Sequence, residues 1–355
     1  NSNYSSKDGV LFNKDKTELI RYPERKTGTE YTVPDSVTSI GAYAFSGTSL
    51  VNINIPDSVT NVYSDAFERC TSLTSINVSE GNSTYSSDGG VLFDKYKTEI
   101  IRYPVGKTNA KYAIPVGVTS IGDWAFSGCT SLASIEIPVG VTSIGAGAFD
   151  SCGSLTSVEI PAGVTSIGNS AFYGCNLQTV YYEGDLAGWC GIQGLQGLMT
   201  QGITLYIDGQ EVAGDVVIPD GVTGIGANAF AECDGFGETL SLPDSVKAVG
   251  ESAFYQCEGF TGLKLSASLT RIEKLSFAFM YGLRTEVAIP EGVTELGEGA
   301  FECSYMPSVR LPSTLKKIEK QAFMYAHNLT KITLPDGLET IGDEAFDGCR
   351  LKKAI

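Results

Sequence analysis

The sequence has little of the material from which catalytic and nucleic-acid-binding sites are usually built. It contains a single histidine, His327, and 25 lysines and arginines against 41 aspartates and glutamates. The resulting net charge of −16 argues against a nucleic-acid partner, because binding a polyanion requires a basic stripe, and it disfavours anionic lipid. The acidic balance favours solubility and leaves cationic partners open.

Two further kinds of segment are missing. No apolar run approaches the length of a membrane-spanning helix, so we expect no membrane insertion. No signal peptide is present either. The chain opens within an irregular stretch and stops at LKKAI, where a repeat strand would continue. We therefore expect it to be a segment of a longer protein, with its export signal and anchor outside it.

What the sequence does contain is one unit repeated eleven times. The unit reads L-x-x-I-x-I-P-x-x-V-x-x-I-G-x-x-A-F-x-x-C, and its clearest copy is SLASIEIPVGVTSIGAGAFDSC, residues 131–152. A proline precedes each frame phenylalanine by eleven residues, except where Ser266 stands in that position. The spacing is 22 to 24 residues apart from two intervals of 59 and 58. The eleven phenylalanines, which we expect to form the structural core, are Phe45, Phe67, Phe126, Phe149, Phe172, Phe230, Phe254, Phe277, Phe301, Phe323 and Phe346.

Each part of the unit has a physical interpretation. The alternation I-x-I is typical of a short strand with one buried face. The proline ends the strand because it lacks an N–H, and the Asp or Gly behind it suits a turn. Ile and Phe five residues apart predict a short helical or 3₁₀ turn. One such unit is too small to be stable alone, so the units must stack as coils of a solenoid.

The repeat resembles the 23-residue leucine-rich repeat of BspA-like bacterial surface proteins, which is related to a repeat of treponemal proteins. With this resemblance we predict an α/β solenoid over residues 1–355, a single right-handed leucine-rich repeat superhelix. It would carry a parallel β-sheet on one face, short helical or 3₁₀ turns on the other, and β-hairpin insertions. The resemblance also implies an extracellular or cell-surface location and a role in adhesion or recognition, without a shared catalytic residue.

The nine cysteines are expected to be structural. Seven lie three residues after a frame phenylalanine, and Cys303 lies two after one in a shortened repeat. Thr48, Met280 or Ala326 fills that slot elsewhere, which indicates buried free thiols that act as small hydrophobes. Cys190 lies outside this series and has no identifiable activating partner. No C-x-x-C pair supports zinc, so we expect no metal and no cofactor.

Irregular inserts lie near residues 1–33, 79–113 and 183–217. Residues 9–34 match residues 90–115 at an offset of 81, and the runs VLF and ELIRY or EIIRY predict a β-hairpin in each copy. In the third insert Asp208-Gly209 predicts a tight hairpin turn. The inserts are the least repetitive segments, so they are candidates for a distinguishing surface, while their aromatic residues could equally brace the solenoid.

One stretch imitates a nucleotide-binding loop. Gly224-Ile225-Gly226-Ala227-Asn228-Ala229 fits G-x-G-x-x-[GA]. However, Gly226 is the regular glycine of the repeat, and Gly224 replaces a serine found in other copies. The β-α-β setting that the fingerprint requires is not predicted here. We interpret the string as part of the repeat.

The outward positions of the strands form the candidate binding face. Glu136 and Glu159 occupy the same slot in consecutive coils, about 5 Å apart if the strands pair, where they could hold Ca²⁺ or act together as carboxylates. The residues of this face are Asn54, Asn77, Glu136, Glu159, Tyr181, Lys264 and Arg310. We predict a monomeric, non-catalytic extracellular module that binds a protein or glycan through this face and the inserts. The alternative is a structural spacer that presents another domain.

Overall fold

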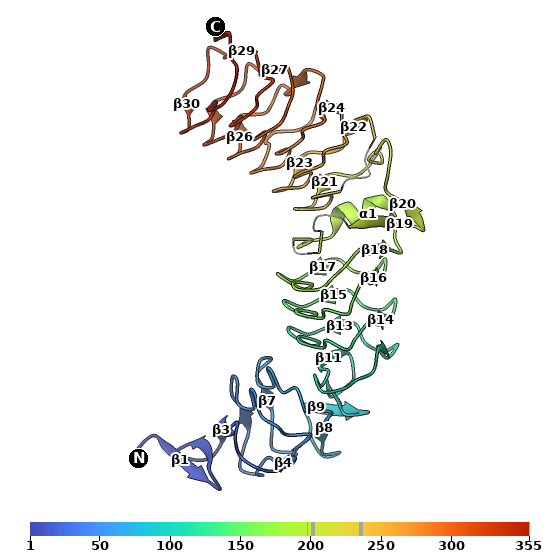
Figure 1. Ribbon diagram of the computed structural model, residues 1–355, viewed down its shortest axis with the longest axis vertical. Coiled ribbons are helices and arrows are strands. Elements are labelled where there is room, and N and C mark those ends of the chain that lie inside the picture. Colours follow the sequence, from blue (N-terminus) through green and yellow to red (C-terminus); the bar gives the residue numbers. More distant parts are fainter. Residues whose placement is uncertain (197, 200–202, 234–236, 355) are drawn as a thin grey trace. The chain divides into compact units, whose positions relative to one another are not determined.

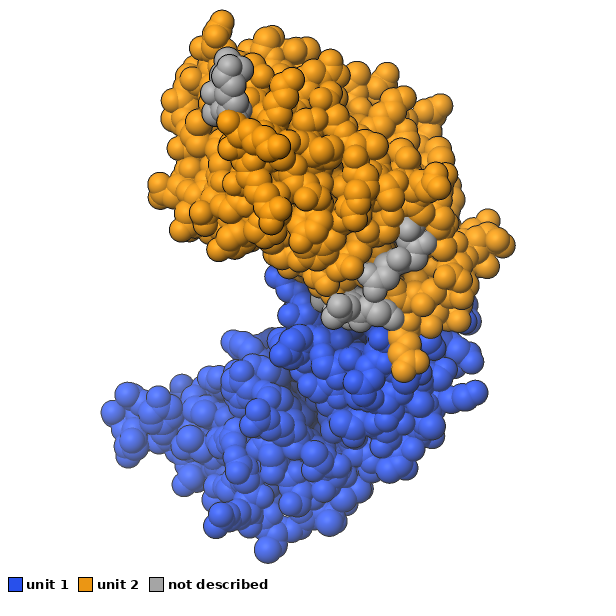
Figure 2. All heavy atoms as spheres, turned by 45° about the horizontal axis from the view of Figure 1, so that its top comes forward, with its two compact units in different colours: residues 1–177 blue, residues 178–355 orange. Residues whose placement is uncertain are grey.

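The structure is a computed structural model that describes residues 1–196, 198–199, 203–233 and 237–354. Its internal contacts divide the chain into two compact units, Asn1–Leu177 and Gln178–Ile355, each of which is described by itself (Figures 1 and 2). Both units are β-solenoids of stacked coils. That the whole chain forms one solenoid, and that it winds right-handed, stay predictions.

Each regular coil contributes a short strand ahead of its proline. In unit 1 these strands run parallel, so that Tyr31 pairs with Ile53 and Ile53 with Ile76. In unit 2 Val309 pairs in the same way with Val287 and with Ile332. The strands of this first row are β4 (Glu30–Thr32), β6 (Asn52–Ile55), β8 (Ser75–Val78), β12 (Lys111–Ala113), β14 (Ser134–Glu136), β16 (Ser157–Ile160), β18 (Thr179–Tyr182), β22 (Thr239–Ser241), β24 (Gly262–Lys264), β25 (Val287–Ala288), β27 (Ser308–Arg310), β29 (Lys331–Thr333) and β31 (Lys353–Ala354).

A second row of parallel strands, which the sequence interpretation missed, lies at the repeated Ser-Ile. Ser120 pairs with Ser143 and Ser143 with Ser166, each one coil apart. The buried isoleucine that was assigned to a helical turn is therefore a strand residue. The second row comprises β5 (Ser39–Ile40), β7 (Asn61–Val62), β13 (Ser120–Ile121), β15 (Ser143–Ile144), β17 (Ser166–Ile167), β21 (Gly224–Ile225), β23 (Ala248–Val249), β26 (Glu295–Leu296), β28 (Lys317–Ile318) and β30 (Thr340–Ile341).

The predicted helical or 3₁₀ turns around the frame phenylalanines are not found in the described part of the chain. In the coil of Phe126, Ala125 and Ser127 donate their N–H groups within the coil, to Gly122 O at 3.3 Å and Trp124 O at 3.1 Å. Phe126 itself donates to Ala148 O of the next coil at 2.7 Å. Every second N–H of this turn donates to a carbonyl oxygen of the next coil. The i→i+3 hydrogen bonds of a 3₁₀-helix therefore cannot form at consecutive residues.

This alternation requires left-handed backbone on both sides of the phenylalanine. Trp124, two residues before Phe126, has φ +58°, and Gly128, two residues after it, has φ +77°. Glycine is favoured there because it lacks a Cβ, yet many coils place other residues at these positions. Apart from α1 (Leu186–Gly191), whose N-terminus is capped by Asp185, the described residues contain no α-helix.

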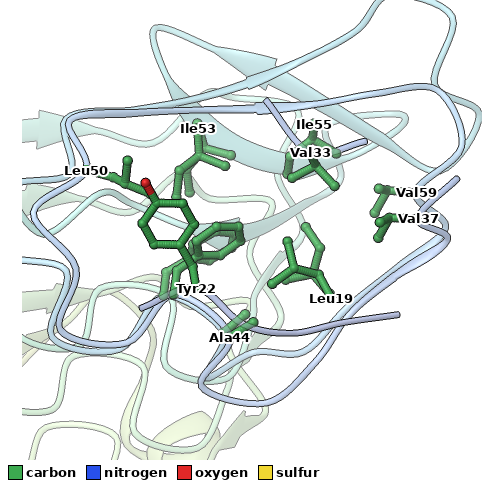
Figure 3. Close-up of a cluster of buried hydrophobic side chains, with 14 of the residues drawn as sticks. Leu19, Tyr22, Val33, Val37, Ala44, Leu50, Ile53, Ile55 and Val59 are labelled. Carbon is green, nitrogen blue, oxygen red and sulfur yellow. The ribbon is translucent and has the colours of Figure 1, made fainter. Parts of the chain in front are cut away.

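The frame phenylalanines form ring columns inside the coils. Ten of the eleven are buried, and Phe346 in the last coil is half-buried. Phe126 and Phe149 stack with centroids 5.0 Å apart, and Phe149 and Phe172 repeat that spacing. Tyr22 begins the first column, in the cluster of buried side chains shown in Figure 3. Such offset-stacked rings combine a large buried area with favourable ring geometry.

The slot three residues after each frame phenylalanine holds a hydrogen-bond donor in most coils. Cys70 Sγ donates to the carbonyl oxygen of Phe45 in the preceding coil at 3.0 Å, and Cys257 does the same to Phe230 at 3.0 Å. The cysteines of the described residues are free thiols. One assignment was wrong: in the shortened repeat the slot belongs to Ser304, which donates to Phe277 O at 2.7 Å. Cys303 instead occupies the left-handed position, with φ +52°.

The inserts form antiparallel hairpins at the predicted places. β2 (Val10–Asn13) pairs with β3 (Glu18–Arg21), and β10 (Val91–Asp94) pairs with β11 (Glu99–Arg102). Each hairpin carries a third strand that was not predicted, β1 (Tyr4–Lys7) or β9 (Tyr85–Asp88). In the third insert β19 (Thr204–Ile207) turns through Asp208 and Gly209, φ +48° and +70°, into β20 (Gln210–Glu211).

The third insert also contributes a bracing contact within unit 2. Trp189 on α1 is fully buried, and its indole Nε1 donates to Ala229 O at 2.7 Å. In the regular coils that carbonyl position accepts an N–H from the preceding frame phenylalanine, as in Phe126 N to Ala148 O. The tryptophan therefore substitutes for a backbone donor where the repeat is interrupted.

Candidate functional site

The outward-facing side chains of the first strand row are named the strand face. In unit 1 the predicted residues Asn54 and Asn77 lie on it and bind each other. Asn77 Nδ2 donates to Asn54 Oδ1 at 3.0 Å, and Asn54 Nδ2 donates to Glu30 Oε1 at 2.8 Å. These amides are therefore partly occupied by links between coils.

Glu136 and Glu159 are both exposed, on β14 and β16. No ion pair or hydrogen bond within the described residues involves either carboxylate. Among those residues there is also no group of three or more side chains that could hold a metal ion. The pair lies on the surface as predicted, and a role in Ca²⁺ binding stays a prediction.

In unit 2 the strand face begins with two tyrosines. Tyr181 on β18 stacks on Tyr206 of β19, with centroids 5.0 Å apart and ring planes at 27°. Tyr206 Oη also contacts Glu211 Oε2 at 3.4 Å. Sequence reasoning named only Tyr181, because Tyr206 lies in the insert, outside the repeat frame. Lys264 is exposed on β24, paired in register with Ser241.

Arg310 is a predicted strand-face residue that lines a groove. It lies on β27 in a groove of about 470 Å³, lined also by Lys331 and Thr333 of β29 and by Glu286 and Glu291. The Arg310 side chain is 73 % exposed, and its Nε is 4.0 Å from Glu286 Oε1. Sequence reasoning missed Lys331, because it pairs in register with Ser308 and lies two residues before Thr333, which occupies the slot of Arg310.

The groove is held in shape by hydrogen bonds from its serines. Ser308 Oγ donates to Glu286 Oε2 at 3.1 Å. Ser313 donates to Glu291 Oε2 from both its backbone N, at 3.1 Å, and its Oγ, at 2.9 Å. The two glutamates are thus fixed, while the cationic groups of Arg310 and Lys331 project from exposed side chains.

The residues considered for catalysis do not form a reactive cluster. Cys190 is buried on α1, and burial raises the pKa of its thiol to about 12. His327 is exposed, and its Nδ1 lies 3.0 Å from Gly348 O. Gly224 lies on β21 in parallel pairing with β23, so the nucleotide-like string is part of the second strand row. None of the helices within the described ranges is long and apolar enough to cross a bilayer.

Charge is unevenly distributed along the sequence. Between Lys111 and Lys247 there is no lysine or arginine, so this stretch cannot neutralise its own carboxylates. On the strand face cations return at Lys264 and again at Arg310 and Lys331. The acidic residues of the stretch are Asp123, Glu136, Asp150, Glu159, Glu183, Asp185, Asp208, Glu211, Asp215, Asp220, Glu232, Asp234, Glu238 and Asp244.

The fold is similar to those of two solved bacterial proteins. A leucine-rich cell surface protein from Faecalibacterium prausnitzii matches with a TM-score of 0.53 and 23 % identity, covering 99 % of this chain and 94 % of that one. A leucine-rich repeat protein from Bacteroides ovatus matches with a TM-score of 0.51 and 24 % identity, covering 99 % and 92 %. At these identities the likeness concerns the fold. The search of curated proteins finds no match.

A family model confirms the resemblance that the repeat suggested. The model, described as a BspA type leucine-rich repeat region, matches with six copies over residues 24–104, 106–187, 212–302 and 258–355. None of the matches described above carries the name of an enzyme. Because the family model covers most of the chain, the protein belongs to the BspA-type leucine-rich repeat family.

Proposed function

We propose that the protein is a non-catalytic recognition module of the bacterial cell surface. It acts as a monomer and binds a protein or glycan through the strand face and the hairpin inserts. The groove around Arg310 supports this proposal, because it combines exposed cations with glutamates fixed by serine hydrogen bonds on an otherwise acidic chain. The positive charges of Arg310 and Lys331 favour an acidic segment of the ligand through electrostatic complementarity.

A second candidate function is a structural spacer that holds another domain away from the surface. The links between Asn77, Asn54 and Glu30 favour it, because they use strand-face side chains to join coils instead of leaving them available to a ligand. The two functions differ in one measurable respect. A recognition module has a saturable ligand, and a spacer has none.

The test uses the full chain on an array of host matrix proteins, mucins and glycans. For each ligand found, binding is compared with the double variant Arg310→Glu, Lys331→Glu. We expect the double variant to bind at least about tenfold more weakly, since it reverses two charges in the groove. The matched control is Lys247→Glu, Lys320→Glu, which makes the same charge change at exposed positions off the groove.

Equal loss in both double variants would mean that only net charge matters, and would contradict recognition at the groove. An array without any saturable ligand would favour the spacer.

A further inference from the structure

The first strand row of unit 1 is interrupted at the second hairpin. β4, β6 and β8 form one parallel sheet, and β12 pairs with β14 in another. Between these sheets the chain forms the strands β9, β10 and β11, and this hairpin docks on β8 through a hydrogen bond from Ile76 N to Gly90 O at 2.9 Å. Within unit 1, all of which is described, β12 has a paired strand on one edge only.

The backbone groups of β12 divide between its two edges. Ala110 O and Ile114 N both bond to residues of β14, at 3.0 Å each. Because successive residues of a strand direct these groups to alternate edges, the N–H and C=O groups of Lys111 and Ala113 point away from β14. None of the described residues is bonded to them, and both residues are exposed. This side of β12, named the open edge, therefore presents free backbone donors and acceptors.

A pocket of about 320 Å³ lies beside the open edge. Tyr112, Ala113 and Pro115 line it from β12 and the corner that follows, and Asp88 and Gly89 line it from the tip of the second hairpin. A Cβ atom at Gly89 would meet nothing within 4 Å. The hairpin tip therefore leaves room for further chain next to Ala113.

Two lysines give the open edge a positive charge. Lys107 lines the pocket, with its Nζ 5.9 Å from the ring centroid of Tyr103, and Lys111 is exposed on β12 itself. Neither ammonium group forms an ion pair or a hydrogen bond with another residue of unit 1. The nearby carboxylate of Asp88 is already paired with Lys97 at 2.7 Å, which holds the pKa of Asp88 below its usual value. The free cations favour an acidic partner.

The first hairpin provides a natural comparison, because β4 begins its sheet with a matching edge. Glu30 stands there at the position equivalent to Lys111. Lys26, which matches Lys107, donates to the carbonyl oxygen of Asp8 at the tip of the first hairpin. The edge of β4 is therefore acidic and its lysine is occupied, whereas the open edge of β12 is cationic and its lysines are free.

An unpaired strand edge is a template for pairing with another chain. Added strands gain affinity from main-chain hydrogen bonds and specificity from pockets for alternate side chains. We propose that the open edge of β12 binds an extended segment of a partner protein as an added strand, with an acidic residue beside Lys111 and an apolar side chain in the pocket against Tyr112. The position beside Ala113 takes an uncharged residue, because Glu136 of β14 pairs with Ala113 in register. The site is separate from the groove around Arg310.

The first measurement is amide hydrogen exchange of the full chain, followed by NMR. In the free chain the amides of Lys111 and Ala113 should exchange fast, whereas those of Tyr112 and Ile114 are protected by β14. A bound strand should slow exchange at Lys111 and Ala113 at least about tenfold.

The probes are blocked peptides of about six residues, the length of an average strand. In them threonine alternates with valine, phenylalanine or tyrosine, and one threonine is replaced by glutamate. We expect at least one peptide to bind with a dissociation constant of about 1 mM or below, as a few exposed hydrogen bonds and one ion pair allow. Two further copies are N-methylated at one or the other set of alternate amides. Only one of these copies should bind, because only one set of N–H groups faces β12.

The decisive variant is Ala113→Pro, because proline removes an N–H that is unbonded in the free chain and is tolerated on edge strands. It should weaken peptide binding at least about tenfold, through the lost donor and the bulk of the ring. Thr32→Pro, the matching change on β4, is the control and should leave binding unchanged. Lys111→Glu should shift the preference from the glutamate peptide to its lysine counterpart, and it keeps the test valid if the proline variant does not fold. Arg310→Glu should have no effect.

The proposal is overturned if no peptide binds saturably up to about 10 mM, beyond which affinity is negligible. It is also overturned if Thr32→Pro weakens binding as much as Ala113→Pro. Equal binding of both N-methylated copies would show that side chains alone make the contact. A dimer of the free chain, seen by sedimentation and dissociated by Ala113→Pro, would assign the open edge to a second copy instead of a partner protein.

Discussion

At the scale of the single residue, the slot three positions after the frame phenylalanine joins neighbouring coils through a side-chain donor in most coils. Ser304 shows the arrangement most clearly, because it donates to Phe277 O and also accepts from Met280 N at 3.3 Å. Ser304→Ala should lower the free energy of unfolding by about 1–3 kcal/mol, since both buried backbone groups lose a partner.

Ser304→Cys is the matched control, because cysteine fills the same slot in other coils and keeps a donor. It should stay within about 1 kcal/mol of the parent chain. Urea unfolding followed by circular dichroism measures both variants. If alanine and cysteine were equally destabilising, the slot would act through its volume and not through its hydrogen bond.

The thiols of the same slot should differ in reactivity along the stack. Burial raises the pKa of Cys129 to about 12 and that of Cys349, in the last coil, to about 11. Because the thiolate is the reacting species, a raised pKa means slower alkylation at pH 8. In the folded chain iodoacetamide should label Cys349 well before Cys129, as measured by peptide mass spectrometry. In urea the order should vanish, and equal labelling of the folded chain would contradict the burial.

At the scale of the element, the two hairpin copies allow a matched substitution. Gly9 and Gly90 both have φ +80°. A Cβ at Gly9 would meet nothing within 4 Å, whereas one at Gly90 would lie 2.7 Å from Ser75 Oγ and 2.9 Å from Ser75 Cα on β8. Gly9→Ala should cost about 1–2 kcal/mol of left-handed strain, and Gly90→Ala about 1–3 kcal/mol more from the clash.

Urea unfolding of the two variants under identical conditions gives the comparison. Equal losses would mean that the second hairpin does not dock on β8 as described. The hydrogen bond from Ile76 N to Gly90 O, at 2.9 Å, supports the docking.

The hairpins also show which strands could be predicted from the sequence and which could not. The runs VLF and EIIRY alternate apolar residues on both sides of a polar turn, so β10 and β11 were predictable. β9 was not, because Tyr85–Asp88 is polar and lacks that pattern. The conformation of the turns around Phe126 was missed for another reason. The spacing of five residues between Ile and Phe also fits a helix. The N–H of Phe126 instead donates to Ala148 O in the next coil, a partner that a single repeat does not reveal.

For the candidate sites too, positions set by a local sequence pattern were predictable, and positions set by contacts between coils were not. The strand face was predictable, because position 310 faces outward in an alternating strand, and Arg310 does line a groove. The burial of Arg102 was not predictable, because RY looks identical in both hairpin copies. Arg102 is 2 % exposed and donates to the carbonyl oxygens of Trp124, Ser127 and, more weakly, Phe67. Arg21 is partly exposed and pairs with Glu24, a position that Val105 occupies in the second copy.

At the scale of the whole molecule, charge should act against stability. The net charge is −16, and the stretch between Lys111 and Lys247 has no cation of its own. Raising NaCl from 0.01 to 0.15 M shortens the Debye length from about 30 Å to about 8 Å, which screens this repulsion. The urea midpoint should therefore rise with salt. A falling midpoint would mean that ion pairs such as Lys317–Glu295 outweigh the repulsion.

A stack in which each coil contacts only its neighbours should also respond locally to damage. Phe149 is fully buried and stacks on Phe126 and Phe172, so Phe149→Ala should cost about 3–5 kcal/mol. Hydrogen exchange followed by mass spectrometry should show lost protection over the coils of residues 118–172. Coils around Phe277 and Phe301 should keep theirs. Uniform loss across both units would mean that the chain unfolds as one cooperative body, whereas a loss that ends within unit 1 would show that the two units respond separately to damage in the ring column.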